Sequence, residues 1–145
     1  MCLMLYLATS DDQPLRSSPD LNVEEVENTR EAVRQWFSLP TVRFIGAHTG
    51  CSCGFPSVVA EEPVEYYDRM FGDDEDREAD LRSVRSLIEL LRDHLSSSRQ
   101  VAMYPVWDGD EGLPPKGTIN LRLDAVDART FVFSQQFLYR VTRAG

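Results

Sequence analysis

An amphipathic repeat between Arg77 and Leu95 constrains the fold of this chain more than any other feature of its sequence. Apolar residues recur there at three- and four-residue spacing, and charged residues occupy most of the other positions. The apolar members are Leu81, Val84, Leu87, Ile88, Leu91 and Leu95. The pattern predicts one long helix with a single apolar face, and that face must pack against another layer of secondary structure.

A shorter helix is predicted over residues 28–37. Asn28 is typical of helix starts, because its side chain can accept a hydrogen bond from a free amide of the first turn, and Glu31 can reach back to the cap. Pro40 ends the segment. One longer helix from Val23 to Phe37 is the alternative, but an asparagine favours a boundary over a helix interior.

A further short helix is predicted from Val64 to Phe71. Pro63 suits a first helical turn, and Gly72 suits the residue after a helix end. The acidic run Asp73–Asp76 comes next, but it lacks the glycine and the distal glutamate of a calcium-binding loop. We therefore interpret the run as the start of the long helix, where the helix dipole favours negative charge.

Strands are predicted on both sides of these helices. Cys2–Thr9 is short and almost wholly apolar, which predicts a central strand that is buried on both faces. Further strands are predicted at Leu21–Val26, Val42–Ala47, Val101–Trp107 and Thr118–Leu123, and Phe131–Phe133 with Phe137–Val141 are expected to form a closing hairpin.

The order of these elements predicts an α+β fold. We expect a single globular domain over residues 1–145, with a mixed or mostly antiparallel sheet on which the long amphipathic helix and one or two shorter helices pack. A chain of 145 residues can bury roughly two-thirds of its unfolded surface, so the core needs no disulfide or metal to hold it.

The acidic composition excludes some partners. The net charge is −9, and the lysines and arginines are scattered among carboxylates. Nucleic-acid binding requires clustered basic residues that neutralise phosphates, and anionic membranes attract the same kind of cluster. We therefore expect no nucleic acid and no membrane as a partner.

The N-terminal segment and the cysteine count predict a compartment. Met1–Ala8 is apolar but lacks the basic region of a signal peptide, and no apolar run approaches the length of a membrane span. Three cysteines are an odd number, and two of them are separated by one residue. That is a poor disulfide framework, so we expect a soluble protein in the reducing cytoplasm.

A histidine and two cysteines lie close together after the predicted strand Val42–Ala47. They form the pattern His48-x-x-Cys51-x-Cys53, with a glycine on each side of the cysteine pair. Thiolates and a neutral imidazole suit Zn²⁺ or a similar ion, so we predict His48, Cys51 and Cys53 as candidate metal ligands. A fourth ligand would come from elsewhere in the chain, with Cys2, His94 or an acidic residue as candidates.

Two other interpretations of this segment stay open. Cys51 or Cys53, with His48 as base, would suit a thiol-dependent enzyme or redox protein, in which the second cysteine resolves an oxidised intermediate. Alternatively, both cysteines are small apolar residues that pack in a tight turn.

The pattern also differs from the paired Cys-x-x-Cys of common zinc sites, so the leading expectation is a non-catalytic structural or interaction module. Its partner would be another protein or a second copy of the chain. Zinc binding is the first alternative and thiol chemistry the second.

Overall fold

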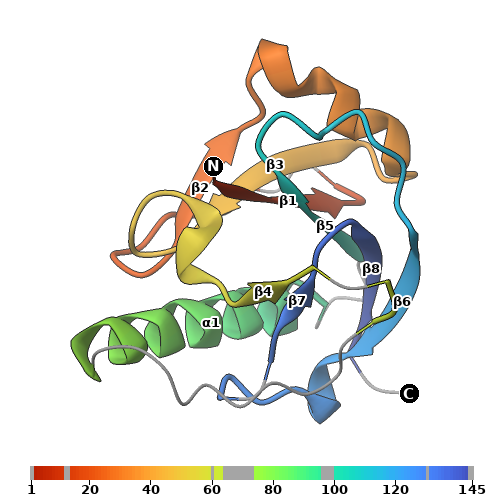
Figure 1. Cartoon of the computed structure of the whole chain (residues 1–145). Coiled ribbons are helices and arrows are strands. Elements are labelled where there is room, and N and C mark those ends of the chain that lie inside the picture. Colours follow the sequence, from red (N-terminus) through yellow and green to blue (C-terminus); the bar gives the residue numbers. More distant parts are fainter. Residues whose placement is uncertain are drawn as a thin grey trace.

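A mixed six-stranded sheet forms the centre of the protein (Figure 1). The computed structural model describes residues 2–11, 14–59, 61–63, 74–95, 100–129 and 131–143. The strands are β1 (Leu3–Thr9), β2 (Asn22–Glu25), β3 (Thr41–Gly46), β5 (Val101–Trp107), β6 (Gly117–Arg122) and β8 (Phe137–Thr142). Their order is β2-β3-β1-β5-β8-β6, and all neighbours are antiparallel except β6 and β8. This confirms the expected mixed sheet with mostly antiparallel pairing.

Strand β1 is central, because it pairs with β3 on one side and β5 on the other. Its side chains alternate between two apolar clusters. Leu5 and Leu7 join the cluster that contains the long helix, and Met4, Tyr6 and Ala8 join the cluster on the opposite face. The prediction of a central strand buried on both faces is confirmed.

The long helix α1 (Asp74–Leu95) packs its apolar stripe on the first of these faces. All six residues of the stripe are buried: Leu81, Val84, Leu87, Ile88, Leu91 and Leu95. The acidic residues Asp74–Asp76 lie in the first described turn of the helix. The shorter helix predicted at Val64–Phe71 lies outside the described residues. No helix among the described residues combines the length and the apolar character needed to cross a membrane.

The opposite face is covered by η1 (Asn28–Trp36), a 3-10 helix whose Val33 is fully buried. A strand, β2, precedes η1, so the predicted strand at Leu21–Val26 and the shorter helical segment are confirmed, and the alternative of one helix from Val23 to Phe37 is wrong. The expected cap is also wrong, because the cap position is Glu27, no side chain bonds there, and Glu31 pairs with Arg34 at 2.6 Å.

Contacts with the β5–β6 connection explain why η1 is held in place without a cap. The Arg30 guanidinium pairs with Asp108 and lies 3.4 Å from a Glu111 carboxylate oxygen. The Trp36 indole N–H donates to the Glu111 carbonyl at 2.9 Å. Tertiary contacts therefore supply the fixation that a side-chain cap would otherwise give.

The expected closing hairpin is also wrong. β7 (Phe133–Ser134) pairs in parallel with β4 (Ser57–Val58) in a small second sheet, and β8 joins the main sheet. The turn between β7 and β8 makes its hydrogen bonds to other strands: the Gln135 N–H donates to the Val58 carbonyl, and the Gln136 N–H donates to the Pro105 carbonyl. Gln136 has a φ of 65°, so the chain reverses direction there without closing a two-stranded ladder.

Candidate functional site

The chain leaves β3 through a tight turn that leads to the two cysteines. The Gly50 N–H donates to the Ala47 carbonyl at 2.9 Å, and the Ala47 N–H donates to the Cys51 carbonyl at 2.8 Å. A Cβ on Gly46 would lie 2.2 Å from the Gly50 carbonyl oxygen, so only glycine fits there. Gly50 itself has a φ of +87°, a conformation that favours glycine. The glycines thus allow the turn to fold back on the end of β3.

A buried serine fastens this turn to β1. Ser52 is the first residue of the short 3-10 helix η2 (Ser52–Gly54) and is fully buried. Its hydroxyl accepts a hydrogen bond from the Leu5 N–H at 2.8 Å and donates one to the Ile45 carbonyl at 2.6 Å. Leu5 and Ile45 are partners at the end of the β1–β3 ladder. Ser52 therefore holds η2 beside the start of β1, with one cysteine on either side of it in sequence.

This fixation brings all three cysteines of the chain together. The sulfurs of Cys2, Cys51 and Cys53 lie within 4.8 Å of one another, and all three are free thiols. Cys2 precedes β1, and its carbonyl accepts a hydrogen bond from the Asp108 N–H at 2.8 Å. Cys2 and Cys51 are half-buried, and Cys53 is exposed. Three thiolates on one tetrahedral Zn²⁺ have their sulfurs about 3.8 Å apart, so small side-chain rotations would suffice to close a site.

The three thiols are not equivalent. Partial burial acts to raise the pKa of Cys51, but hydrogen bonds with the Thr49 hydroxyl, the Cys53 N–H and the Cys53 thiol outweigh it, and the pKa is lowered. The Thr49 oxygen lies 3.4 Å from the Cys51 sulfur. Desolvation, together with the hydrogen bonds it shares with the Cys51 and Cys2 thiols, raises the pKa of Cys53 to about 11. The cluster therefore combines one thiol with a lowered pKa and one with a raised pKa.

The structure places the other predicted ligand, His48, against α1. Its ring Nε2 lies 2.8 Å from an Asp80 carboxylate oxygen, and its backbone N–H donates to the Ser83 hydroxyl at 3.0 Å. Of the predicted ligands, Cys51 and Cys53 are brought together, whereas the His48 ring is engaged by Asp80. Shared metal binding by His48, Cys51 and Cys53 stays a prediction.

The two remote candidates for a fourth ligand lie far apart in the fold. Cys2 joins the sulfur group at the start of β1. His94 lies near the end of α1, where its Nε2 is 3.9 Å from an Asp11 carboxylate oxygen. The sequence alone predicts Cys2 only as one of several remote ligands. The signal that could have found it is antiparallel pairing, which places the start of one strand beside the end of its neighbour.

A small acidic cavity opens beside the thiols. Its volume is about 250 Å³, and both Cys2 and Cys51 line it. The other side chains that line it are mainly apolar or acidic: Met4, Tyr6, Val26, Phe44, Glu24, Glu25, Glu27, Asp108 and Arg30. Four carboxylates thus face one guanidinium, which is itself paired with Asp108. The cavity therefore favours a cation over an anion.

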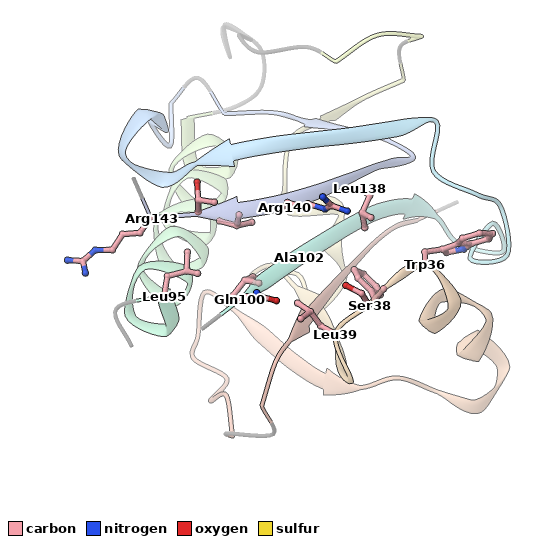
Figure 2. A pocket seen from close by; sticks show the side chains of 13 residues that line it. Trp36, Ser38, Leu39, Leu95, Gln100, Ala102, Leu138, Arg140 and Arg143 are labelled. Atoms are coloured by element: carbon pink, nitrogen blue, oxygen red, sulfur yellow. The ribbon is translucent and has the colours of Figure 1, made fainter. Parts of the chain in front are cut away.

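A larger groove of about 660 Å³ is lined by residues of both apolar clusters. Figure 2 shows Trp36, Leu39, Ala102 and Leu138 around it, with Arg140 also in the lining. Among the described residues that line this groove there is no cysteine, histidine or carboxylate. Its lining combines apolar side chains with the arginines Arg140 and Arg143.

Comparisons with known proteins give the chain no relatives from which a role could be transferred. Neither the models of protein families, nor the curated proteins, nor the solved structures contain a match to it.

Proposed function

We propose that this protein binds a thiophilic metal ion, Zn²⁺ in the first place, through the thiolates of Cys2, Cys51 and Cys53. The observation that carries the proposal is the gathering of the three sulfurs within 4.8 Å of one another. They come from two separate segments, the start of β1 and the turn after β3. Thiolates are preferred ligands of zinc, and three protein ligands are enough for a zinc site that keeps one position open.

The exposure of the cysteines favours this role over simple packing. Cysteines that serve as small apolar residues are among the most buried residue types. Here Cys53 is exposed, and Cys2 and Cys51 are half-buried at a cavity. Between the two cysteines, Ser52 is fully buried and makes the structural hydrogen bonds. Packing is therefore done by the serine, and the sulfurs are left accessible.

The charge around the site favours a divalent ion over a monovalent one. Three thiolates carry a charge of −3, so Zn²⁺ leaves a net charge of −1 and Cu⁺ leaves −2. Several carboxylates line the adjacent cavity, including Glu24, Glu27 and Asp108. Because like charges repel, the more fully neutralised zinc site is the more stable one in this surrounding. Water or a small ligand in the cavity would take the fourth position.

A zinc ion at this place would tie the turn after β3 to the start of β1. Such a site is compatible with a non-catalytic structural or interaction module, because closed or nearly closed thiolate sites stabilise folds directly. Three thiols this close together stay reduced in a reducing compartment, so we propose that the protein works in the cytoplasm.

A metal titration tests the proposal. Reduced protein, freed of metal by a chelator under anaerobic conditions, is titrated with Zn²⁺ in competition with a chromophoric chelator. We expect one ion per chain, and Co²⁺ in the same place should give the sulfur-to-metal charge-transfer bands of a thiolate site. Each of Cys2→Ser, Cys51→Ser and Cys53→Ser should weaken binding by at least about tenfold.

The control variant for this titration is Ser17→Ala, which removes an exposed hydroxyl outside the cluster. It should bind zinc as the unaltered chain does. Wild-type protein that takes up no zinc, or a Cys51→Ser variant that binds as tightly as wild type, would overturn the proposal. In that case the expectation of a metal-free structural module would be the one left to test.

A further inference from the structure

We propose that Cys51 is a thiol that reacts with hydroperoxides, and that its oxidation joins it to a neighbouring sulfur of the cluster in a disulfide. The step itself needs only the thiols. Its consequence for a bound metal, described below, rests on the proposed function.

The placement of the sulfurs supports this reaction. A reactive cysteine forms an intramolecular disulfide when a second thiol lies close enough to attack it after oxidation. Both Cys2 and Cys53 have their sulfurs within 4.8 Å of the Cys51 sulfur. Cys2 lies at the start of β1 and Cys53 within η2, so the two candidate partners approach Cys51 from different segments.

Access for the oxidant is provided by the cavity beside the thiols. Its volume of about 250 Å³ has room for hydrogen peroxide or a small organic hydroperoxide, and Cys51 lines it. The apolar part of the lining includes Met4 and Phe44. A neutral hydroperoxide is not repelled by the carboxylates there, whereas an anionic oxidant would be.

The placement of Cys51 makes it the attacking thiol. Cys51 and Cys2 both line the cavity, whereas Cys53 does not. Of these two, Cys51 has a hydroxyl beside its sulfur, because the Thr49 oxygen lies 3.4 Å away, and this hydroxyl can hydrogen-bond to the thiolate, which is the nucleophilic form.

The reaction has two balanced steps. First, the Cys51 thiolate attacks the hydroperoxide, an S–O bond forms, the O–O bond breaks, and the departing alkoxide or hydroxide takes a proton to become an alcohol or water. Second, a neighbouring thiol attacks the sulfenic sulfur, the S–S bond forms, the S–O bond breaks, and the departing hydroxide takes the proton of that thiol. In sum, two thiols are oxidised, one hydroperoxide is reduced, and the products are a disulfide, an alcohol or water, and a further water.

The disulfide would remove two of the three proposed metal ligands at once. A single remaining thiol does not hold Zn²⁺, because the site needs several deprotonated protein ligands. Hydroperoxide would thus release the metal, and a thiol reductant would restore the site.

The first experiment uses reduced, metal-free protein and hydrogen peroxide. We expect mass spectrometry to show the loss of two hydrogen atoms, peptide mapping to place Cys51 in the new disulfide, and dithiothreitol to reverse the change. The Cys51→Ser variant should react at least about tenfold more slowly, and so should wild-type protein unfolded in urea, where the activating contacts are lost. Ser17→Ala should react as wild type does.

Several results would overturn the inference: no intramolecular disulfide, a disulfide that does not contain Cys51, or equal rates for wild type and Cys51→Ser. A second experiment adds peroxide to zinc-loaded protein in the presence of a zinc-sensitive dye, where we expect release in step with disulfide formation. Zinc that stays bound to the disulfide form would refute the release. If the reduced protein binds no zinc, the proposed function fails, while the metal-free experiment still decides whether Cys51 is oxidised.

Discussion

The hydroxyl of Ser52 accepts a hydrogen bond from the backbone N–H of Leu5 at 2.8 Å, in a place where neither group is exposed to water. The same hydroxyl donates to the Ile45 carbonyl at 2.6 Å. One side chain thus completes the end of the β1–β3 ladder and fixes the turn that carries Cys51 and Cys53. The position of the sulfurs depends on this serine.

Replacing Ser52 with alanine should therefore harm both stability and the thiol cluster. The variant leaves a buried N–H and a buried carbonyl without their partner, which costs about 1–3 kcal/mol each in unfolding free energy. Denaturant unfolding measures this loss. Ser17→Ala is the control, because its hydroxyl bonds the Val23 backbone at an exposed site where water can replace it. An effect of Ser52→Ala no larger than that of Ser17→Ala would contradict the role assigned to Ser52.

Gly46 should tolerate no side chain. A Cβ at this position would lie 2.2 Å from the Gly50 carbonyl oxygen, so Gly46→Ala must push the turn away from β3. We expect a loss of about 1–3 kcal/mol in unfolding free energy and weaker zinc binding, because the cysteines move with the turn. Gly112→Ala is the matched control, since its Cβ would meet its nearest neighbour at 3.8 Å. If both variants unfold at the same denaturant concentration, the close packing of the turn against Gly46 is contradicted.

The elements that could be predicted from the sequence are those with a local period. In β1 both the odd-numbered and the even-numbered residues are apolar, which predicts a strand buried on both faces. Leu5 and Leu7 accordingly join one apolar cluster, and Met4 and Tyr6 join the other. The stripe of α1 is buried for the same kind of reason, because spacing along a helix determines the face on which a residue lies.

What could not be predicted depends on pairing between distant segments. The Cys-x-Cys turn is visible in the sequence, but the nearness of Cys2 follows from the antiparallel pairing of β1 with β3 and from the Ser52 hydroxyl between them. The contact of His48 with Asp80 likewise depends on where α1 crosses the sheet. Asn28 fails as a cap because Arg30 and its acidic partners fix η1 instead. Residue spacing within one segment does not predict these contacts, because each joins segments that are distant in the sequence.

Substitution of His48 should distinguish between two ligand sets: the one predicted from the sequence, which includes His48, and the one proposed from the structure, which includes Cys2 instead. Because its ring is engaged by Asp80 at 2.8 Å, His48→Ala should change zinc affinity by less than about threefold, while Cys2→Ser should weaken it by at least about tenfold. Competitive zinc titration of both variants gives the answer. A large loss with His48→Ala and none with Cys2→Ser would instead support the ligand set predicted from the sequence alone.

The thiols should also titrate in a defined order in the metal-free protein. Because the pKa of Cys51 is lowered, its alkylation rate should rise to half its maximum at a lower pH than that of an ordinary cysteine, whereas that of Cys53 should do so near pH 11. Alkylation with iodoacetamide across pH, followed by peptide mapping, measures both. Equal midpoints for the two cysteines would show that the hydrogen bonds of Thr49 and Cys53 do not act on Cys51 in solution.

The same difference predicts how stability depends on pH. In the unfolded chain Cys53 loses its proton near pH 8.5, but in the folded protein it keeps the proton to about pH 11. The stability contributed by the Cys53 thiol is therefore fully present below about pH 8.5 and is lost as the pH rises through about 11. Buried tyrosines with raised pKa values, such as Tyr139, change stability in the same range, so the comparison must be made with a variant. The unfolding free energy of Cys53→Ser should fall less than that of wild type between pH 8.5 and 11, and parallel pH curves for the two proteins would contradict a raised pKa at Cys53.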